Sequence, residues 1–197
     1  MYLLYLFNDY RYIGRMRLRY HQERATQAAA RLLKLRGGAM SYMKLLKLMY
    51  LADRKALLEH GRPITYDRFV SMDHGPVLSQ TYNLIVAEES PEEHSYWRQF
   101  ISEPANYEVS LLHDAPSGEL SRAQEDVLES VFAEFGHMSR WDLVTFCHTL
   151  PEWVDPKGSS NPIALSDVLR AGGMEADDVD AVVEALSAED ALDQLLV

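Results

Sequence analysis

The residues of this 197-residue chain that are best able to do chemistry are seven histidines and one cysteine. Cys147 and His148 are adjacent, but neighbours on a helix point about 100° apart, so they do not form a local thiol–imidazole dyad. We interpret Cys147 as a small core residue. The chain contains no GxSxG, HExxH, P-loop or GxGxxG motif. The sequence therefore predicts no catalytic residue, no cofactor and no enzymatic activity.

Metal binding is not indicated by the spacing of the histidines. They stand at positions 21, 60, 74, 94, 113, 137 and 148, and none lies four residues from another, the spacing that places two ligands on one helix face. Acidic pairs such as Asp177-Asp178 are more typical of solvated helix ends. We expect no metal site.

The stretch DHGPV, residues 73–77, joins a titratable imidazole to a Gly-Pro turn. A loop of this kind can present His74 as a general base. The alternative is that Gly75 relaxes the backbone, Pro76 starts the next helix and His74 makes a structural hydrogen bond. No nucleophile or carboxylate partner lies in the same segment, so we favour a turn that shapes a binding face. The predicted partner-binding residues are Asp73, His74, Gly75, Pro76, Val77 and Tyr82.

Several aromatic residues gather around this turn and a later loop. They are Tyr66, Phe69, Tyr82, Trp97, Tyr107, Trp141 and Trp153. Aromatic side chains are frequent in the hot spots of protein interfaces, but they are also ordinary core material. We expect most of them in the core and one or two at an interface.

The elements that must position these residues are mainly helices. Leucine and alanine spacing, with capping residues, predicts helices over 23–36, 41–60, 78–89, 122–135, 140–150, 163–171 and 175–197. The segments 64–72, 96–101 and 106–112 are predicted to be strands of one antiparallel sheet. The fold class is therefore mainly α: a single compact helical domain with a small antiparallel β-sheet (α+β).

Local signals set the limits of these helices. Ser41 is a candidate N-cap, Gly61 a left-handed stop, and Ser121 opens a capping box. In the helix over 41–60, we expect Lys44 and Lys47 to lie mostly off the buried face. A second helix is expected to restart at Ser187 in the tail.

Charge divides the chain unevenly. Residues 1–75 carry 14 Lys/Arg and 6 Asp/Glu, a net +8, whereas residues 76–197 carry 5 and 24, a net −19. We expect a basic leader or extension over 1–22, a domain over 23–172 and an acidic helical tail over 173–197. The acidic half makes nucleic acid an unlikely partner, because phosphates would be repelled. A single cysteine and no long apolar run predict a cytoplasmic protein without a membrane span.

The order of motifs resembles a known family. The run KLLKLMYLADRKALLEHGRPITYDRFVSMDHGPVLSQTYNLI, residues 44–85, is similar to the core signature of the Panacea domain family, the SocA-like antitoxins. The resemblance continues more weakly over residues 25–172, through a late His148 and then Pro151-Glu152-Trp153. The family usually has an aromatic residue where this chain has His74.

The resemblance implies a protein that neutralises a cognate protein toxin by direct contact and has no enzymatic activity. One branch of the family acts instead as an adaptor that delivers its partner to a bacterial AAA+ protease, and this is the alternative function. A second alternative from the residues themselves is a hydrolase built on converging His74, His113 and His148 with nearby acids. Homo-oligomer formation is left open.

Overall fold

The computed structural model of the protein describes residues 19–86 and 95–195, so most of the expected leader over 1–22 lies outside the described residues. Its helices are α2 (Gln22–Arg36), α3 (Tyr42–His60), α4 (Ser79–Val86), α5 (Ser95–Phe100), α6 (Arg122–Phe135), α7 (Arg140–Cys147), α8 (Leu165–Ala171) and α9 (Ala176–Leu195). Its strands are β1 (Ala39–Ser41), β2 (Phe69–Ser71), β3 (Val77–Leu78), β4 (Glu108–Ser110) and β5 (Asn161–Pro162). The mainly helical α+β class is confirmed.

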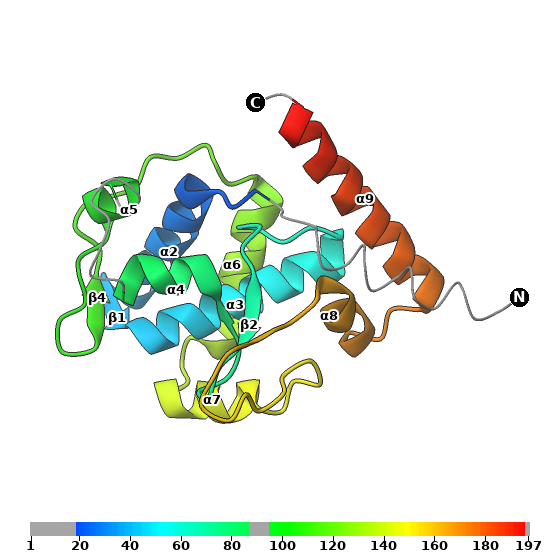
Figure 1. Ribbon diagram of the computed structural model, residues 1–197. Coiled ribbons are helices and arrows are strands. Elements are labelled where there is room, and N and C mark those ends of the chain that lie inside the picture. Colours follow the sequence, from blue (N-terminus) through cyan, green and yellow to red (C-terminus); the bar gives the residue numbers. More distant parts are fainter. Residues whose placement is uncertain (1–18, 87–94, 196–197) are drawn as a thin grey trace, which may run out of the picture.

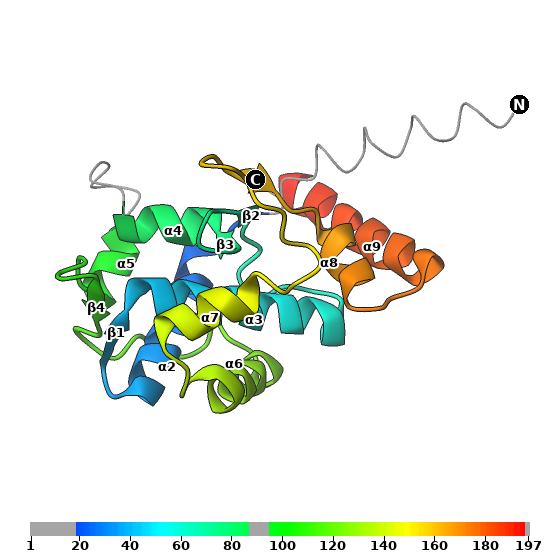
Figure 2. The same ribbon diagram turned by 90° about the horizontal axis from the view of Figure 1, so that it is seen from below.

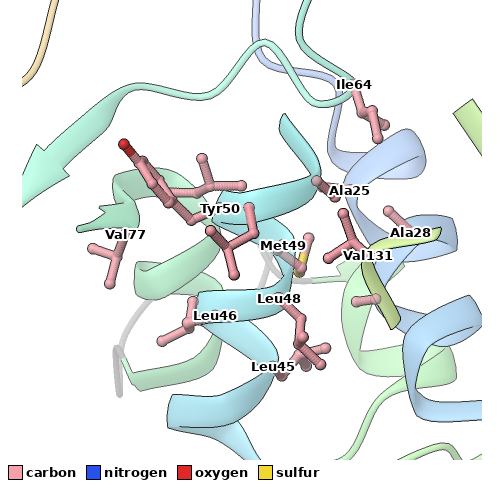
Figure 3. Packing of buried hydrophobic residues seen from close by; sticks show 14 of the residues in the cluster. Ala25, Ala28, Leu45, Leu46, Leu48, Met49, Tyr50, Ile64, Val77 and Val131 are labelled. Carbon is pink, nitrogen blue, oxygen red and sulfur yellow. The ribbon is translucent and has the colours of Figure 1, made fainter. Parts of the chain in front are cut away.

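Helix α3 runs through the middle of the domain, with α2 and α6 on one side and α7, β3 and α4 around the rest (Figure 1). Leu45, Leu48 and Met49 point from α3 toward α2 and α6, as Figure 3 shows. These side chains are at most 1% exposed. Because neighbours surround it, α3 is buried on all faces over residues 44–53, which a single-face periodicity does not reveal.

The expectation for Lys44 and Lys47 was wrong. Both side chains lie in the interior of the domain, at 7% and 1% exposure. A buried ammonium must keep its hydrogen bonds, and both lysines donate to backbone carbonyls of distant segments. The two residues therefore tie α3 to the chain that packs around it.

The expected single sheet was also wrong. β1 pairs with β4, and a separate sheet has the order β3-β2-β5, with both its pairings antiparallel. Residues 96–101 lie mostly in helix α5 instead of a strand, and α5 packs against α2. Trp97 and Ile101 are both buried, and this four-residue spacing fits the helical period. A six-residue segment with one dominant aromatic does not distinguish the two periods.

Most local signals were confirmed. Gly61 ends α3 in the left-handed conformation, at φ 69°. Ser121 and Ser139 open α6 and α7 with reciprocal capping boxes. The restart at Ser187 was wrong, since α9 is continuous and the Ser187 hydroxyl donates to the Val183 carbonyl. Figure 2 shows α9 beside α8, at the C-terminal end of α3.

Among residues 19–86 and 95–195, no helix combines the length and the apolar character that crossing a bilayer requires.

Candidate partner-binding surface

The DHGPV turn is the tip of a hairpin. β2 precedes it and β3 follows it, with Val70 opposite Val77 in the register. The Gly75 amide donates to the Met72 carbonyl at 2.9 Å and closes the turn. Pro76 therefore directly precedes strand β3, and α4 begins only at Ser79, which corrects the expectation that Pro76 starts the helix.

Gly75 is required both by conformation and by space. Its φ is +88°, a region that side-chain-bearing residues rarely adopt. A Cβ at this position would lie 3.1 Å from the Cys147 Cβ and 3.3 Å from the Lys47 Nζ. The turn is therefore seated directly on α7 and α3. The Lys47 ammonium completes this seat by donating to the Pro76 carbonyl at 2.7 Å.

Two late aromatic side chains hold the other side of the turn. The His148 Nε2 lies 3.1 Å from the Asp73 carbonyl oxygen. Since a carbonyl only accepts, this contact requires the His148 tautomer that is protonated at Nε2. The Trp153 ring stacks on His148 with 4.1 Å between centroids, and its Nε1 donates to the Met72 carbonyl at 3.1 Å. His148 and Trp153 thereby fix the backbone on the N-terminal side of the turn.

A network around Glu152 anchors the segment that carries Trp153. The Glu152 carboxylate is buried and accepts from the Tyr50 hydroxyl at 2.9 Å and from the Arg54 Nε at 2.6 Å. Burial, and then the charge of Glu152, raises the pKa of Tyr50 well above its ordinary value. Tyr50 therefore stays a hydroxyl donor, and the loop after α7 is tied to the middle of α3.

Above this support, three side chains reach solvent and form what we call the turn face: Asp73, His74 and Trp141. The His74 and Trp141 rings meet edge to face, with centroids 5.7 Å apart. Trp141 is 51% exposed, which is high for a large apolar side chain. The turn and the start of α7 therefore present an imidazole and an indole side by side.

The structure distributes the predicted partner-binding residues unequally. Asp73 and His74 are exposed at the tip, whereas Gly75, Pro76 and Val77 are buried beneath it. Tyr82 is half-buried on α4, the helix that follows the hairpin. Their role in binding stays a prediction. Asp73, His74 and part of Tyr82 are accessible to a partner, whereas Gly75, Pro76 and Val77 would need a rearrangement.

Sequence reasoning left three residues out of the site. His148 and Trp153 were recognised by their order in the family pattern, and Trp141 as one of many aromatics. Nothing in their spacing indicated that all three would meet the turn, since His148 and Asp73 are 75 positions apart. The signal that pointed toward them was the family pattern, in which the late histidine and Pro-x-Trp accompany the Gly-Pro turn.

Two titratable groups beneath the turn, Cys147 and Lys47, have shifted pKa values. Burial raises the pKa of the Cys147 thiol to about 11, so it is not a thiolate at neutral pH. Burial lowers the pKa of Lys47 to about 8. Of the histidines considered for a hydrolase, His148 contacts the turn through the Asp73 carbonyl, and His74 belongs to the turn and packs on Trp141. His113 instead follows β4, the strand that pairs with β1. No group of three potential metal ligands occurs among the residues that the structure describes.

The architecture defines a class of protein: a mainly helical domain in which a Gly-Pro hairpin is clamped between a central helix and a late His–Trp pair. Residues 45–154, more than half of the chain, match the family described as antitoxin SocA-like, Panacea domain, and the chain belongs to that family. The match runs from α3 to the loop that carries Trp153. Comparison with the curated proteins found no match to the chain, and neither did comparison with the solved structures.

Proposed function

We propose that this protein is an antitoxin that neutralises a cognate protein toxin in the cytoplasm by direct contact through the turn face. Membership of the SocA-like Panacea family supports an antitoxin-like role. The single observation that carries the choice of surface is the contact between His74 on the hairpin and the half-exposed Trp141 of α7.

Trp141 is the side chain expected to contribute most to toxin binding. An indole left half in water gains free energy when a partner covers it, and tryptophan is enriched among residues that dominate binding. The turn beneath it is fixed by Lys47, His148 and Trp153. A preformed surface loses little conformational entropy on association, so more of the contact energy appears as affinity.

The charge of the chain supports the same proposal. Residues 76–197 carry a net −19, which would draw a basic toxin toward the protein and raise the association rate. Such steering weakens as salt rises, because the Debye length is about 10 Å at 0.1 M. We expect association with the toxin to slow with ionic strength while dissociation changes little.

The test is co-expression with the product of the adjacent gene, scored as rescue of growth and as co-purification. Trp141→Ala is expected to abolish rescue and to weaken binding by about 30-fold or more, the loss of a hot-spot residue of about 2 kcal/mol. Leu112→Ala is the matched control, because Leu112 is also a half-exposed apolar residue, at 50%, but lies after β4. Full rescue by a folded Trp141→Ala protein refutes the role of the turn face in toxin binding. Failure of the wild-type protein to bind the product of the adjacent gene refutes the antitoxin function itself.

Two further readouts separate this proposal from its alternatives. Direct neutralisation is stoichiometric, so one equivalent of purified protein should abolish the activity of one equivalent of toxin. Inactivation of many toxin molecules by one would favour a hydrolase. Rescue that disappears in a strain without the AAA+ protease would favour an adaptor.

A further inference from the structure

A cleft of about 830 Å³ opens on another side of α3. The end of α2, strand β1, the start of α3 and the connection between α6 and α7 surround it. Figure 2 shows these segments together at the N-terminal end of α3. The volume is in the range of small-molecule sites, roughly 300–1,000 Å³.

The charge of the cleft is opposite to that of the whole chain. Arg36, Lys44 and Arg140 line it, and Glu108 is the one acidic residue among its lining. Three cations less one carboxylate give a net +2 with His137 neutral, on a chain with a net charge of −11. A positive concavity on an acidic protein concentrates anions locally.

Lys44 lies at the bottom of the cleft. Its Nζ donates to the carbonyls of Gly136 at 2.6 Å and Met138 at 2.7 Å, and the residue is 7% exposed. These contacts use two of its three ammonium protons. Burial, and then the neighbouring Arg36, lowers the pKa of Lys44, so the two cations are close enough to repel each other.

The cations of the cleft lack acidic partners within the described ranges. The ion pairs found there, at N–O separations up to 4.0 Å, do not involve Arg36, Lys44 or Arg140. The Arg140 guanidinium instead lies over the Trp141 ring, 5.4 Å from its centroid. Ser41 also lines the cleft, and its hydroxyl oxygen is buried without a hydrogen-bond partner among the described residues. Donors with unused capacity along one cleft are what an oxyanion requires.

We propose that this cleft binds the phosphate monoester group of a small molecule. A dianion matches the net charge of +2, and two guanidinium groups with one ammonium match its three terminal oxygens. Met40 and Phe132 provide an apolar wall for the organic part of the ligand. The N-terminus of α7 is not the binding element, because Ser139 and Asp142 already cap it. This binding needs no toxin and goes beyond the proposed antitoxin function.

The test uses the full chain, calorimetry and thermal unfolding, with three probes at fixed ionic strength: inorganic phosphate, phenyl phosphate and glutamate. Phosphate is expected to stabilise the protein relative to chloride. At a concentration ten times its dissociation constant, it should lower the unfolding equilibrium constant about elevenfold. Phenyl phosphate should bind several times more tightly than phosphate, because of the apolar wall.

Four variants locate the effect. Arg36→Gln and Arg140→Gln should each weaken phosphate binding about tenfold, the loss of one hydrogen bond to a charged group. Glu108→Gln should strengthen it, because the one opposing carboxylate of the cleft is removed. Arg122→Gln, at the far end of α6 with 87% of its side chain exposed, is the matched control and should change nothing.

Four results overturn the proposal. Three are no binding of either phosphate, equal weakening by the Arg122 control, or no gain with Glu108→Gln. The fourth is glutamate binding as tightly as phenyl phosphate, since the cleft would then suit an acidic side chain of a protein. None of these results bears on rescue from the toxin, so failure here and failure of the antitoxin proposal are distinguishable.

Discussion

Replacing Glu152 by alanine is expected to destabilise the domain more than almost any other single charge removal. The side chain of Glu152 is fully buried, and that of Arg54 is 17% exposed. The carboxylate accepts from the Arg54 Nε at 2.6 Å, the Arg54 Nη2 at 3.4 Å and the Tyr50 hydroxyl at 2.9 Å. Alanine leaves a largely buried guanidinium and a buried hydroxyl without their acceptor.

The magnitude follows from that uncompensated charge. Breaking a buried ion pair by removing one partner costs about 3–5 kcal/mol, whereas an exposed pair contributes about 0.2–1 kcal/mol. For a chain of this size, 1 kcal/mol moves Tm by about 2–4 °C, so a fall of about 6–20 °C is expected. The domain should still fold at 25 °C, since natural proteins have about 5–15 kcal/mol of stability.

Urea unfolding at pH 7, followed by circular dichroism, measures the change in unfolding free energy. The matched control is Glu59→Ala, which breaks the exposed i,i+4 pair between Lys55 and Glu59 and should cost less than about 1 kcal/mol. The double variant Arg54→Met with Glu152→Leu removes both charges. It should recover at least half of the loss, because a buried pair exchanged for apolar residues is often neutral or stabilising.

The reasoning fails on either of two results. A loss below about 1 kcal/mol for Glu152→Ala would show that water compensates Arg54 and that the network is not effectively buried. A double variant as unstable as the single one would show that the loss comes from packing and not from the unpaired charge.

Three further changes test other parts of the structure. Gly75→Ala should lower the unfolding free energy by about 2–4 kcal/mol, because of the positive φ and the contact with Cys147. Gly173→Ala is the control: its φ is +86° but the space around it is open, so only the conformational cost of about 1–2 kcal/mol is expected. Equal losses for the two variants would refute the contribution of the Cys147 contact. Burial raises the pKa of Asp53 to about 7, above its unfolded value, so its contribution to stability is complete below about pH 4 and is lost as pH rises through 7, by at most about 4 kcal/mol. Urea titrations from pH 4 to 8 should show this decline relative to Asp53→Asn, and the opposite slope would contradict the assignment. Trp97→Ala should lower the unfolding free energy by about 3–5 kcal/mol, because the indole on α5 is 1% exposed. A loss near zero in a urea titration would contradict the burial of Trp97.

Helix α3 and the DHGPV turn show which features the sequence predicted correctly and which it did not. Apolar spacing with Gly61 placed the end of α3 correctly, because a helix stop depends on adjacent residues. The same spacing misplaced Lys44 and Lys47, because burial of a whole helix depends on how many neighbours surround it. The block over 44–85 gave the family, and the turn at its end was recognised as structural, but its hairpin form was not.

The sequence by itself determined the limits of most helices, the capping boxes, the family and the importance of the Gly-Pro turn. These features depend on residues within a few positions of one another, where spacing is sufficient evidence. Only the tertiary structure decided that His148 and Trp153 hold the turn, that Trp141 stands beside His74, and that two small sheets replace one. Each of these contacts joins segments far apart in the chain, and packing around α3 selects them from many pairings that the sequence allows equally.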